Sequence, residues 1–394
     1  MKPRGPLPKT AGPGGEDKLP DKLVCIDCRY IGARPSGIAE VVRGLVDHVP
    51  PLAPDLRFLL LVSREAERPL STAPNVAERV VPYAANGPAT MWLLPRLVQL
   101  SGVSLFHATF NILPAGLEMP SVTTIHDVMW LKHPRWAAGK GLRGRVDAAF
   151  YGHGIRRALA RSTRIAAVSR ATADEIAGIA PEAAARTRVI LSGVSEEFRP
   201  LAPGELEALP PPAELAGRRF VLTVGQFSPY KNQERALEAF ALAFGDRPDV
   251  HQVFVQRRGE GERLLRPQAE ALGLSGRVHF LSGLGRAELV ALYNRALLLS
   301  HPSLYEGFGN PLAEAMACGC PVVTSAVSAM PEVTGGAALL ADPLDAASVA
   351  QALRRVAGEP GLADRLRRRG LERAQSLSWR RFAETNLAIY RELL

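Results

Sequence analysis

The sequence predicts an α/β protein built from two doubly wound domains, each with a parallel sheet that helices cover on both faces. Short apolar segments alternate with amphipathic helical segments along most of the 394 residues, and this alternation is typical of parallel sheets. A Pro-rich segment, 198–217, interrupts the alternation and has the composition of a linker between domains. The chain is long enough for two sizeable cores. We therefore expect two domains of similar size that face a cleft, with ligands at the carboxyl ends of the strands.

The alternation places the first domain at 22–197 and the second at 218–377. The strands predicted for the first domain are 23–28, 57–62, 104–107, 121–125, 164–168 and 187–191, and its predicted helices are 37–48, 89–101, 141–160 and 171–178. The strands predicted for the second domain are 219–225, 250–255, 277–281, 297–300 and 321–324, and its predicted helices are 231–244, 262–272, 286–295 and 311–318.

The two ends of the chain differ in character. Residues 1–21 are polar, rich in Pro and Gly and without the apolar core of a signal peptide, so we expect a disordered tail. Residues 378–394 read as an amphipathic helix that we expect to pack back toward the first domain. The side chains available for this packing are Trp379, Phe382, Leu387 and Tyr390.

Composition limits the class of protein. Apolar residues make up 47% and charged residues 22% of the chain, as in a soluble globular protein. No apolar run approaches the roughly 18 residues that span a bilayer, so we expect a cytoplasmic protein that touches the membrane face at most. The net charge is +9, with arginines clustered at 140–170 and 354–381. Such clusters attract anionic lipid or acidic substrates, or are merely solvated helix faces. Nucleic acid is not an expected partner, because the 6% of aromatic residues do not interleave with the arginines.

The four cysteines predict neither a metal site nor a redox site. Cys25 and Cys28 lie in a predicted buried strand, where residues i and i+3 point to opposite faces. Cys318 and Cys320 straddle a helix end. We interpret all four as structural thiols of a reducing compartment.

The most informative stretch runs from 303 to 323 and holds two carboxylates eight residues apart, Glu306 and Glu314. Asn310 suits an N-cap, and a helix over 311–318 would start directly after a Gly-rich loop and stop at Gly319. The free N–H groups at such a helix start bind phosphate. Glu306 would lie beside a sugar attached to that phosphate and Glu314 beside a ribose, since carboxylates accept from sugar hydroxyls. The stretch therefore predicts a nucleotide-sugar pocket, lined also by Gly307, Phe308, Gly309, Asn310 and Pro311.

Ser36 and Gly37 stand between the first predicted strand and the first predicted helix. They can cap the helix and let backbone amides approach a phosphate or an acceptor. The turn is not a G-x-G-x-x-G fingerprint and no Walker lysine follows it. It is equally compatible with a turn that serves packing alone.

His126 and Asp127 end a predicted strand at the expected cleft. The imidazole can hydrogen-bond a sugar hydroxyl, and Asp127 can fix its orientation or accept a proton. A His-Asp pair at a strand end can also be structural. His107 is a weaker candidate of the same kind.

Gly225, Gln226 and Lys231 follow the first predicted strand of the second domain. Lys231 can neutralise a pyrophosphate as charge builds on the leaving group. A lysine in the first turn of a helix is, on the other hand, often only a solvated side chain.

These motifs together resemble the retaining glycosyltransferases of family 4 (glycosyl transferases group 1), the large group that includes sucrose synthases and many bacterial mannosyltransferases. The resemblance extends over about 22–394 and implies the GT-B fold, two Rossmann-like domains facing a cleft. The segment from Glu306 to Glu314 is the most specific part. The other parts are Ser36-Gly37-Ile38, His126-Asp127, Val168-Ser169, Gly225, Lys231-Asn232, Pro302-Ser303 and Ser328-Ala-Met-Pro331-Glu332-Val.

The resemblance implies a role for each matching residue. Glu306, His126 and Lys231 would be the catalytic residues: Glu306 and His126 at the donor sugar, Lys231 at its diphosphate. Glu314 would bind the ribose, and Gly37 would approach the phosphates or the acceptor. The co-substrate would be a nucleotide-diphosphate sugar, with no cofactor and no metal, and transfer would retain the anomeric configuration. The chain most resembles the mannosyl- and rhamnosyltransferase branch, which implies GDP-mannose as the donor. The acceptor would be a lipid-linked glycan of a surface polysaccharide.

One position departs from the pattern, because many relatives have Arg where this chain has Gln226. Either Lys231 and the helix dipole suffice for the diphosphate, or Arg257 or Arg258 substitutes, or donor affinity is reduced. Two other functions stay open at this point. One is a sugar-nucleotide-modifying enzyme of similar fold, such as an epimerase or a phosphorylase, and the other is a non-catalytic nucleotide-sugar-binding subunit.

Overall fold

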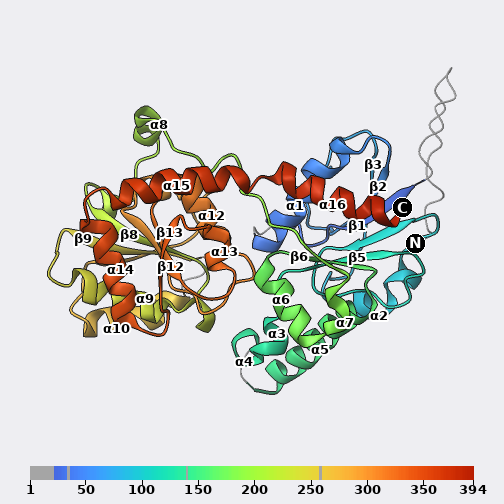
Figure 1. Cartoon of the computed structure of the whole chain (residues 1–394), viewed down its shortest axis with the longest axis horizontal. Helices are drawn as coiled ribbons and strands as arrows, with labels where there is room; N and C mark the ends of the chain where they lie inside the picture. Colours follow the sequence, from blue (N-terminus) through green and yellow to red (C-terminus); the bar gives the residue numbers. More distant parts are fainter. Residues whose placement is uncertain (1–21, 33–35, 139–140, 257–259) are drawn as a thin grey trace.

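The computed structural model describes residues 22–32, 36–138, 141–256 and 260–394. The expected tail at 1–21 and the two arginines considered as substitutes for Gln226, Arg257 and Arg258, lie outside the described residues. Within them the chain forms two parallel sheets, each with helices packed against it (Figure 1). The predicted fold class is confirmed.

The first sheet has seven parallel strands in the order β3-β2-β1-β4-β5-β6-β7, so the chain changes direction across the sheet next to β1. Its strands are β1 (Leu23–Asp27), β2 (Arg57–Val62), β3 (Val76–Val80), β4 (Leu105–Ala108), β5 (Ser121–Ile125), β6 (Arg164–Ala167) and β7 (Thr187–Val189). Its helices are α1 (Gly37–Leu52), α2 (Pro88–Leu97), α3 (Met129–Lys132), α4 (Pro134–Ala137), α5 (Gly141–Arg161), α6 (Arg170–Ile179) and α7 (Pro181–Ala184).

The second sheet has six parallel strands in the order β10-β9-β8-β11-β12-β13. Its strands are β8 (Arg219–Val224), β9 (Val250–Val255), β10 (Val278–Leu281), β11 (Leu298–His301), β12 (Val322–Ser325) and β13 (Ala338–Ala341). The helices around it are α9 (Gln233–Phe244), α10 (Glu260–Ala271), α11 (Arg286–Arg295), α12 (Asn310–Ala317), α13 (Met330–Thr334), α14 (Ala346–Gly358) and α15 (Leu362–Ser376). The Pro-rich segment between the sheets contains a short helix, α8 (Pro203–Ala208).

The central strands are buried on both faces. Along β1, Val24 and Ile26 belong to one hydrophobic core and Cys25 to another, on the opposite side of the sheet. Cys28 joins the core of Val24 and Ile26, so Cys25 and Cys28 point to opposite faces as the strand geometry predicts. All four cysteines are buried and unbridged, and burial raises the pKa of the Cys320 thiol to about 12.

The last helix, α16 (Trp379–Leu393), returns to the first domain and packs along α1. Figure 1 shows α15 and α16 following one another along one side of both domains. The Trp379 indole fills the space where Gly44 and Gly193 lack side chains; a Cβ on Gly44 would lie 2.2 Å from it. Phe382 and Tyr390 complete the core on that face of the first sheet. No helix in the described ranges is long and apolar enough to cross a membrane.

Candidate functional site

The loops that follow β1 and β5 in the first domain meet the loop that follows β11 in the second. A Cβ atom on Gly307 would lie 1.7 Å from the backbone oxygen of His126, and one on Gly37 would lie 3.1 Å from the amide nitrogen of Asn310. The strand ends of the two domains therefore face each other at these residues, where parallel sheets place their ligands.

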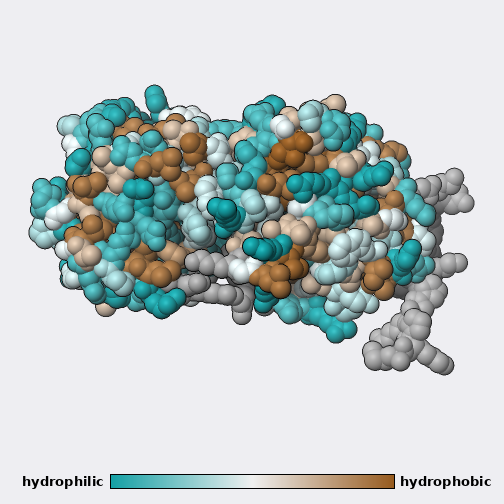
Figure 2. All heavy atoms as spheres, turned by 90° about the horizontal axis from the view of Figure 1, so that it is seen from below, coloured by the Kyte–Doolittle hydropathy of each residue, from teal (hydrophilic) through white to brown (hydrophobic). Residues whose placement is uncertain are grey.

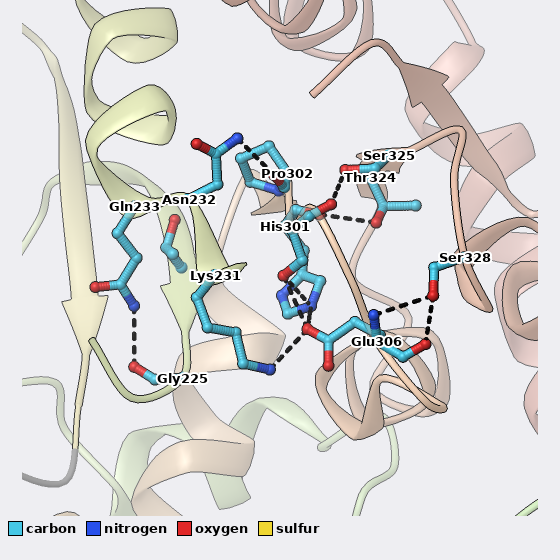
Figure 3. Close-up of polar contacts among 12 residues, drawn as sticks. Gly225, Lys231, Asn232, Gln233, His301, Pro302, Glu306, Thr324, Ser325 and Ser328 are labelled. Carbon is cyan, nitrogen blue, oxygen red and sulfur yellow. Dashed lines mark hydrogen bonds and ion pairs between the residues drawn. The ribbon is translucent and has the colours of Figure 1, made fainter. Parts of the chain in front are cut away.

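Glu306 is the centre of a buried polar cluster (Figure 3). Its side chain is 8% exposed. The Oε1 atom accepts hydrogen bonds from Lys231 Nζ at 2.6 Å, His301 Nε2 at 2.8 Å and Ser303 Oγ at 2.8 Å. The Ser328 hydroxyl donates to the Glu306 backbone oxygen at 2.7 Å. All three side-chain donors thus converge on one oxygen, and no described residue donates to Oε2.

Electrostatic interactions within this cluster determine the protonation states of Glu306 and Lys231. Burial disfavours an ionised Glu306, but the Lys231 ammonium and the His301 hydrogen bond outweigh it and lower the pKa of Glu306 to about 2. Burial also opposes the charged form of Lys231, yet Glu306 raises the pKa of that ammonium above its ordinary value. Glu306 is therefore a carboxylate and Lys231 a cation at neutral pH.

The loop after β8 holds Lys231 in place through two unusual residues. Gly225 has φ 146°, a conformation that side chains disfavour, and its missing Cβ would lie 3.7 Å from the Lys231 stem. Asn232 is left-handed at φ 55°, and its amide donates to Pro302 O at 2.9 Å and to Pro343 O at 2.8 Å. Asn232 thus ties the lysine loop to the loop that carries Glu306.

Helix α12 begins one residue earlier than predicted, and Asn310 is not its N-cap. Gly309 takes that position with φ 94°, a left-handed conformation for which glycine is suited. The Asn310 amide is consequently free of the cap and faces Gly37. Pro311 lies in the first turn and Gly319, at φ 70°, follows the last one, as the sequence predicts.

Glu314 lies one turn into α12 and accepts a hydrogen bond from the Tyr293 hydroxyl at 2.8 Å. Burial raises the pKa of Glu314 to about 7; Tyr293 lowers it, the nearby Glu40 raises it further, and Arg286 lowers it. Glu314 is thus only partly ionised at neutral pH. Arg286 also forms an ion pair with Glu40 of α1. This ion pair joins the two domains close to the Glu314 carboxyl group.

His126 is neutral and has a defined tautomer. Its Nε2 lies 2.8 Å from the backbone oxygen of Thr109, which can only accept, so Nε2 carries the proton and Nδ1 is an acceptor. Burial lowers the pKa of His126 to about 4. Thr109, rather than Asp127, therefore orients the imidazole. Asp127 Oδ1 instead accepts from Met129 N at 3.0 Å, and burial raises the pKa of Asp127 to about 6.

The remaining predicted residues have distinct surroundings. Ser36 caps α1 by accepting from Ala39 N at 3.0 Å. Phe308 is buried in a core of the second domain. The Gln226 side chain is half-buried and makes no hydrogen bond within the described ranges.

His107 belongs to the core and not to the site. It is fully buried, with Nδ1 2.5 Å from the Tyr390 hydroxyl and Nε2 2.8 Å from Thr124 Oγ1. It joins β4 to β5 and to α16.

Three residues of the site had no predicted role: His301, Ser303 and Tyr293. His301 ends β11 five residues before Glu306, and Ser303 stands three residues before it. A strand-end His followed by Ser and Glu is a signal of a shared site that the sequence does carry. Tyr293 gives no such signal, because it reaches Glu314 from a different helix, α11.

Two families match the chain along most of its length. Residues 35–198 match the family described as Glycosyltransferase Family 4, and residues 208–373 match Glycosyl transferases group 1. The first match covers the loops of Gly37 and His126, and the second covers Lys231, Glu306 and Glu314.

One individual protein is similar to the chain in sequence, and two solved structures are similar to it in fold. The chain is 28% identical to the O-antigen chain mannosyltransferase B of Escherichia coli over 290 residues, 73% of this chain and 74% of that protein. The sucrose-phosphate synthase of Thermosynechococcus elongatus has a similar structure, with a TM-score of 0.72, 22% identity, and coverage of 94% of this chain and 99% of that one. Anabaena Alr3699/HepE in complex with UDP-glucose follows at a TM-score of 0.67, 19% identity and coverage of 94% and 100%. The chain belongs to the glycosyltransferases that join a Family 4 domain to a group 1 domain.

Proposed function

We propose that this glycosyltransferase moves a hexose from a nucleotide-diphosphate sugar to a hydroxyl of a growing surface glycan, with retention of configuration. One observation carries the proposal: Lys231 forms a buried ion pair with Glu306, and Glu306 lies in the loop that leads to the N-terminus of α12. The next residue of that loop, Gly307, lies against the backbone of the neutral His126. A cation and a helix start suit a diphosphate, while a carboxylate and a neutral imidazole suit sugar hydroxyls.

The proposed donor is GDP-mannose. The support is the likeness to an O-antigen chain mannosyltransferase, together with the Lys231-Asn232 form of the lysine loop. The structural neighbour that binds UDP-glucose makes UDP-glucose the competing donor. Glu314 with Tyr293 would hold the ribose, which the two nucleotides share, so the base must be distinguished elsewhere.

Different residues of the site would act on the diphosphate and on the sugar. The bond between the sugar carbon and the phosphate oxygen breaks, and the acceptor oxygen bonds to that carbon on the same face. Lys231 and the first N–H groups of α12 stabilise the charge on the departing diphosphate without a metal ion. The leaving phosphate oxygen takes the acceptor proton. His126 Nδ1 accepts from a sugar hydroxyl, and Glu306 Oε2, which lacks a donor among the described residues, accepts from another.

The proposed acceptor is a lipid-linked glycan at the inner face of the cytoplasmic membrane. The support is the basic character of the first domain between 140 and 170, which suits an anionic surface. Donor, acceptor and membrane contact are separate parts of this proposal.

The first test is thermal stabilisation by GDP, UDP, ADP and dTDP and their sugars. A ligand at about 100 times its dissociation constant adds roughly 2.7 kcal/mol to the stability of the folded state. We expect GDP and GDP-mannose to stabilise the chain, and transfer to release GDP while the glycan grows. A response to UDP and its sugars alone would indicate a UDP-sugar as the donor in place of GDP-mannose. An isomerised donor would indicate an epimerase. Binding without any product would indicate a non-catalytic subunit.

A further inference from the structure

Two of the segments that mark the family likeness take no part in the chemistry proposed above. They are Val168-Ser169 in the first domain and Ser328-Ala-Met-Pro331-Glu332-Val in the second. The structure brings them into contact, because Glu332 of α13 accepts hydrogen bonds from the start of α6. Figure 1 shows α6 and α13 on the sides of the two domains that face each other.

The first three residues of α6 have backbone amides without a partner inside the helix. Ser169, the N-cap, accepts from Thr172 N at 3.0 Å. The other two amides donate to the Glu332 carboxylate: Arg170 N lies 2.7 Å from Oε2 and 2.9 Å from Oε1, and Ala171 N lies 3.3 Å from Oε2. A negative charge suits the positive end of the helix dipole. Glu332 therefore completes the cap of a helix that belongs to the other domain.

Hydrophobic packing supports the same contact. Val168 is 3% exposed and belongs to a core cluster formed mainly by residues of the second domain, among them Phe308 and Met330. Ala171 packs against that cluster as well. The second domain thus holds the start of α6 through apolar contacts and hydrogen bonds together.

On the side of the second domain, the segment that carries Glu332 is anchored to the backbone of Glu306. The Ser328 hydroxyl donates to Glu306 O at 2.7 Å and accepts from Glu306 N at 3.2 Å, as Figure 3 shows. Ser328 is left-handed at φ 56°, which is uncommon for a residue with a side chain. Arg373 of α15 donates to Glu332 O at 2.9 Å. These contacts hold Glu332 at a fixed place relative to Glu306.

On the side of the first domain, the start of α6 is tied to the strand that leads to His126. Val168 N donates to the backbone oxygen of Ile125, the last residue of β5, at 3.3 Å, and His126 follows Ile125 directly. Further along α6, Glu175 accepts from the Tyr305 hydroxyl of the second domain at 2.5 Å. Figure 2, which views the molecule from below, shows the two domains in contact and hydrophilic atoms on much of their boundary.

We infer that Glu332 is a positioning residue for sugar transfer: its carboxylate docks the start of α6 and so fixes the His126 loop relative to Glu306. The inference rests on the proposed function. Within the described ranges the carboxylate of Glu332 bonds to the start of α6 alone, so it acts through other residues and not on the sugar. A cap that served only the stability of α6 could come from the first domain, as that of Ser169 does.

The consequence for the reaction follows from the arrangement of the site. Glu306 and His126 would act on one sugar from different domains, so their separation must be held. A shift of about 1 Å between groups that act together lowers a rate by on the order of 100-fold. Loss of the Glu332 contact should therefore lower the rate of transfer and leave the binding of nucleotides unchanged, because Lys231, Glu314 and α12 all belong to the second domain.

Amide hydrogen exchange of the full chain, measured residue by residue, tests the contact without any substrate. The amides of Arg170 and Ala171 should exchange slowly in the wild-type chain and about tenfold or more faster in Glu332→Ala. The Thr172 amide, which Ser169 caps, should exchange at the same rate in both chains. Fast exchange of the first two amides in the wild-type chain would overturn the inference.

Steady-state transfer and titration calorimetry test the positioning. Glu332→Ala should lower kcat by on the order of 100-fold with an unchanged dissociation constant for the nucleoside diphosphate. Glu332→Gln keeps a side-chain oxygen that can accept from both amides, so it should restore most of the rate. A loss in Glu332→Gln as large as that in Glu332→Ala, or a loss of affinity in step with kcat, would contradict a positioning role.

Glu205→Ala is the matched control. Glu205 accepts from Ala202 N at 2.9 Å at the start of α8, which projects away from both sheets in Figure 1. This variant also removes a carboxylate from an amide at a helix start, and it should leave transfer and the exchange of the α6 amides unchanged. Circular dichroism checks the folding of all three variants. An equal loss of transfer in Glu205→Ala would overturn the inference.

The two readouts separate this inference from the proposed function. A wild-type chain that transfers no hexose would remove the proposed function and the positioning role with it, while slow exchange of the two amides would still establish the contact between Glu332 and α6. A chain that transfers hexose equally well with Ala at 332 would keep the proposed function and overturn the inference.

Discussion

The backbone oxygen of His126 occupies the space where a side chain on Gly307 would begin, since a Cβ atom there would lie 1.7 Å away. His126 belongs to the first domain and Gly307 to the second, so this contact sets how closely the two halves of the site approach. Glycine is required at 307 by proximity and not by its backbone conformation, because its φ is not positive.

Gly307→Ala should therefore reduce transfer strongly while each domain stays folded. The added methyl group must push the loop of His126 away, and a misplacement of about 1 Å costs on the order of 100-fold in rate. Steady-state transfer and circular dichroism measure the two effects. The control is Gly204→Ala, where a Cβ meets nothing within 4 Å. Unchanged transfer by the 307 variant would show that the two loops separate during the reaction.

Glu306→Gln should bind nucleoside diphosphates more tightly and transfer more slowly. The carboxylate neutralises Lys231 at 2.6 Å and repels a diphosphate, so its removal frees the cation for the phosphates. The sugar loses its charged acceptor, and we expect transfer to fall by about 100-fold or more. Titration calorimetry and product release report the two quantities. Lys231→Met is the matched variant and should weaken both nucleoside diphosphate binding and transfer. If Glu306→Gln also weakened both binding and transfer, Glu306 and Lys231 would not have separate roles.

The fold was predictable because the central strands are mostly apolar and buried on both faces, as in Leu23–Asp27 and Arg57–Val62. The edge strands β3 and β13 were not predicted. Strand β3 contains Glu78 and Arg79 and is largely half-exposed, and β13 is four residues without β-branched side chains. Helices α14 and α15 were also missed, although α14 has the apolar spacing of a helix packed on one side.

The site was predictable where neighbouring residues in the sequence indicate the role of a side chain, as at Glu306, Glu314 and Lys231. It was not predictable where contacts join distant elements. Tyr293 meets Glu314 across two helices, and the acceptor for His126 is a backbone oxygen from the β4 loop and not the adjacent Asp127. Such partners are set by packing, which the local pattern does not contain.

Glu314→Gln should stabilise the chain at high pH. The pKa of Glu314 rises from 4.5 to about 7 on folding, mainly through burial, so the folded state binds the extra proton between these values. The free energy of unfolding then falls as pH rises from about 4.5 to 7, by roughly 3 kcal/mol. The variant should lose this slope. Urea unfolding at pH 5 and pH 8 measures it, with Glu372→Gln, an exposed site, as the control.

The same variant should bind nucleotides about tenfold or more weakly, because a charge-assisted hydrogen bond to the ribose is lost. A gain of stability with unchanged nucleotide affinity would show that Glu314 does not contact the ribose.

Gly44→Ala and Gly178→Ala should have opposite effects on stability. A Cβ on Gly44 would lie 2.2 Å from the Trp379 indole and must displace α16, which costs about 1–3 kcal/mol. A Cβ on Gly178, in α6, meets nothing within 4 Å, and alanine favours the helix by about 0.5–1 kcal/mol. Urea unfolding measures the change in the free energy of unfolding for each of the two variants. Equal effects would mean that α16 is not held against α1 by this contact.

Gln226→Arg should tighten the binding of nucleoside diphosphates. Lys231 is neutralised by Glu306, so Lys231 brings no surplus positive charge to the two phosphates. Gln226 lies in the same loop, half-buried and without a hydrogen bond in the described ranges, so a longer cationic side chain has room to reach them. A further charge-assisted hydrogen bond would improve the dissociation constant by about tenfold. Gln226→Met, of similar size and uncharged, is the control. If arginine gives no gain, the diphosphate lies nearer to α12 than to the lysine loop, and its charge is met by the helix N-terminus.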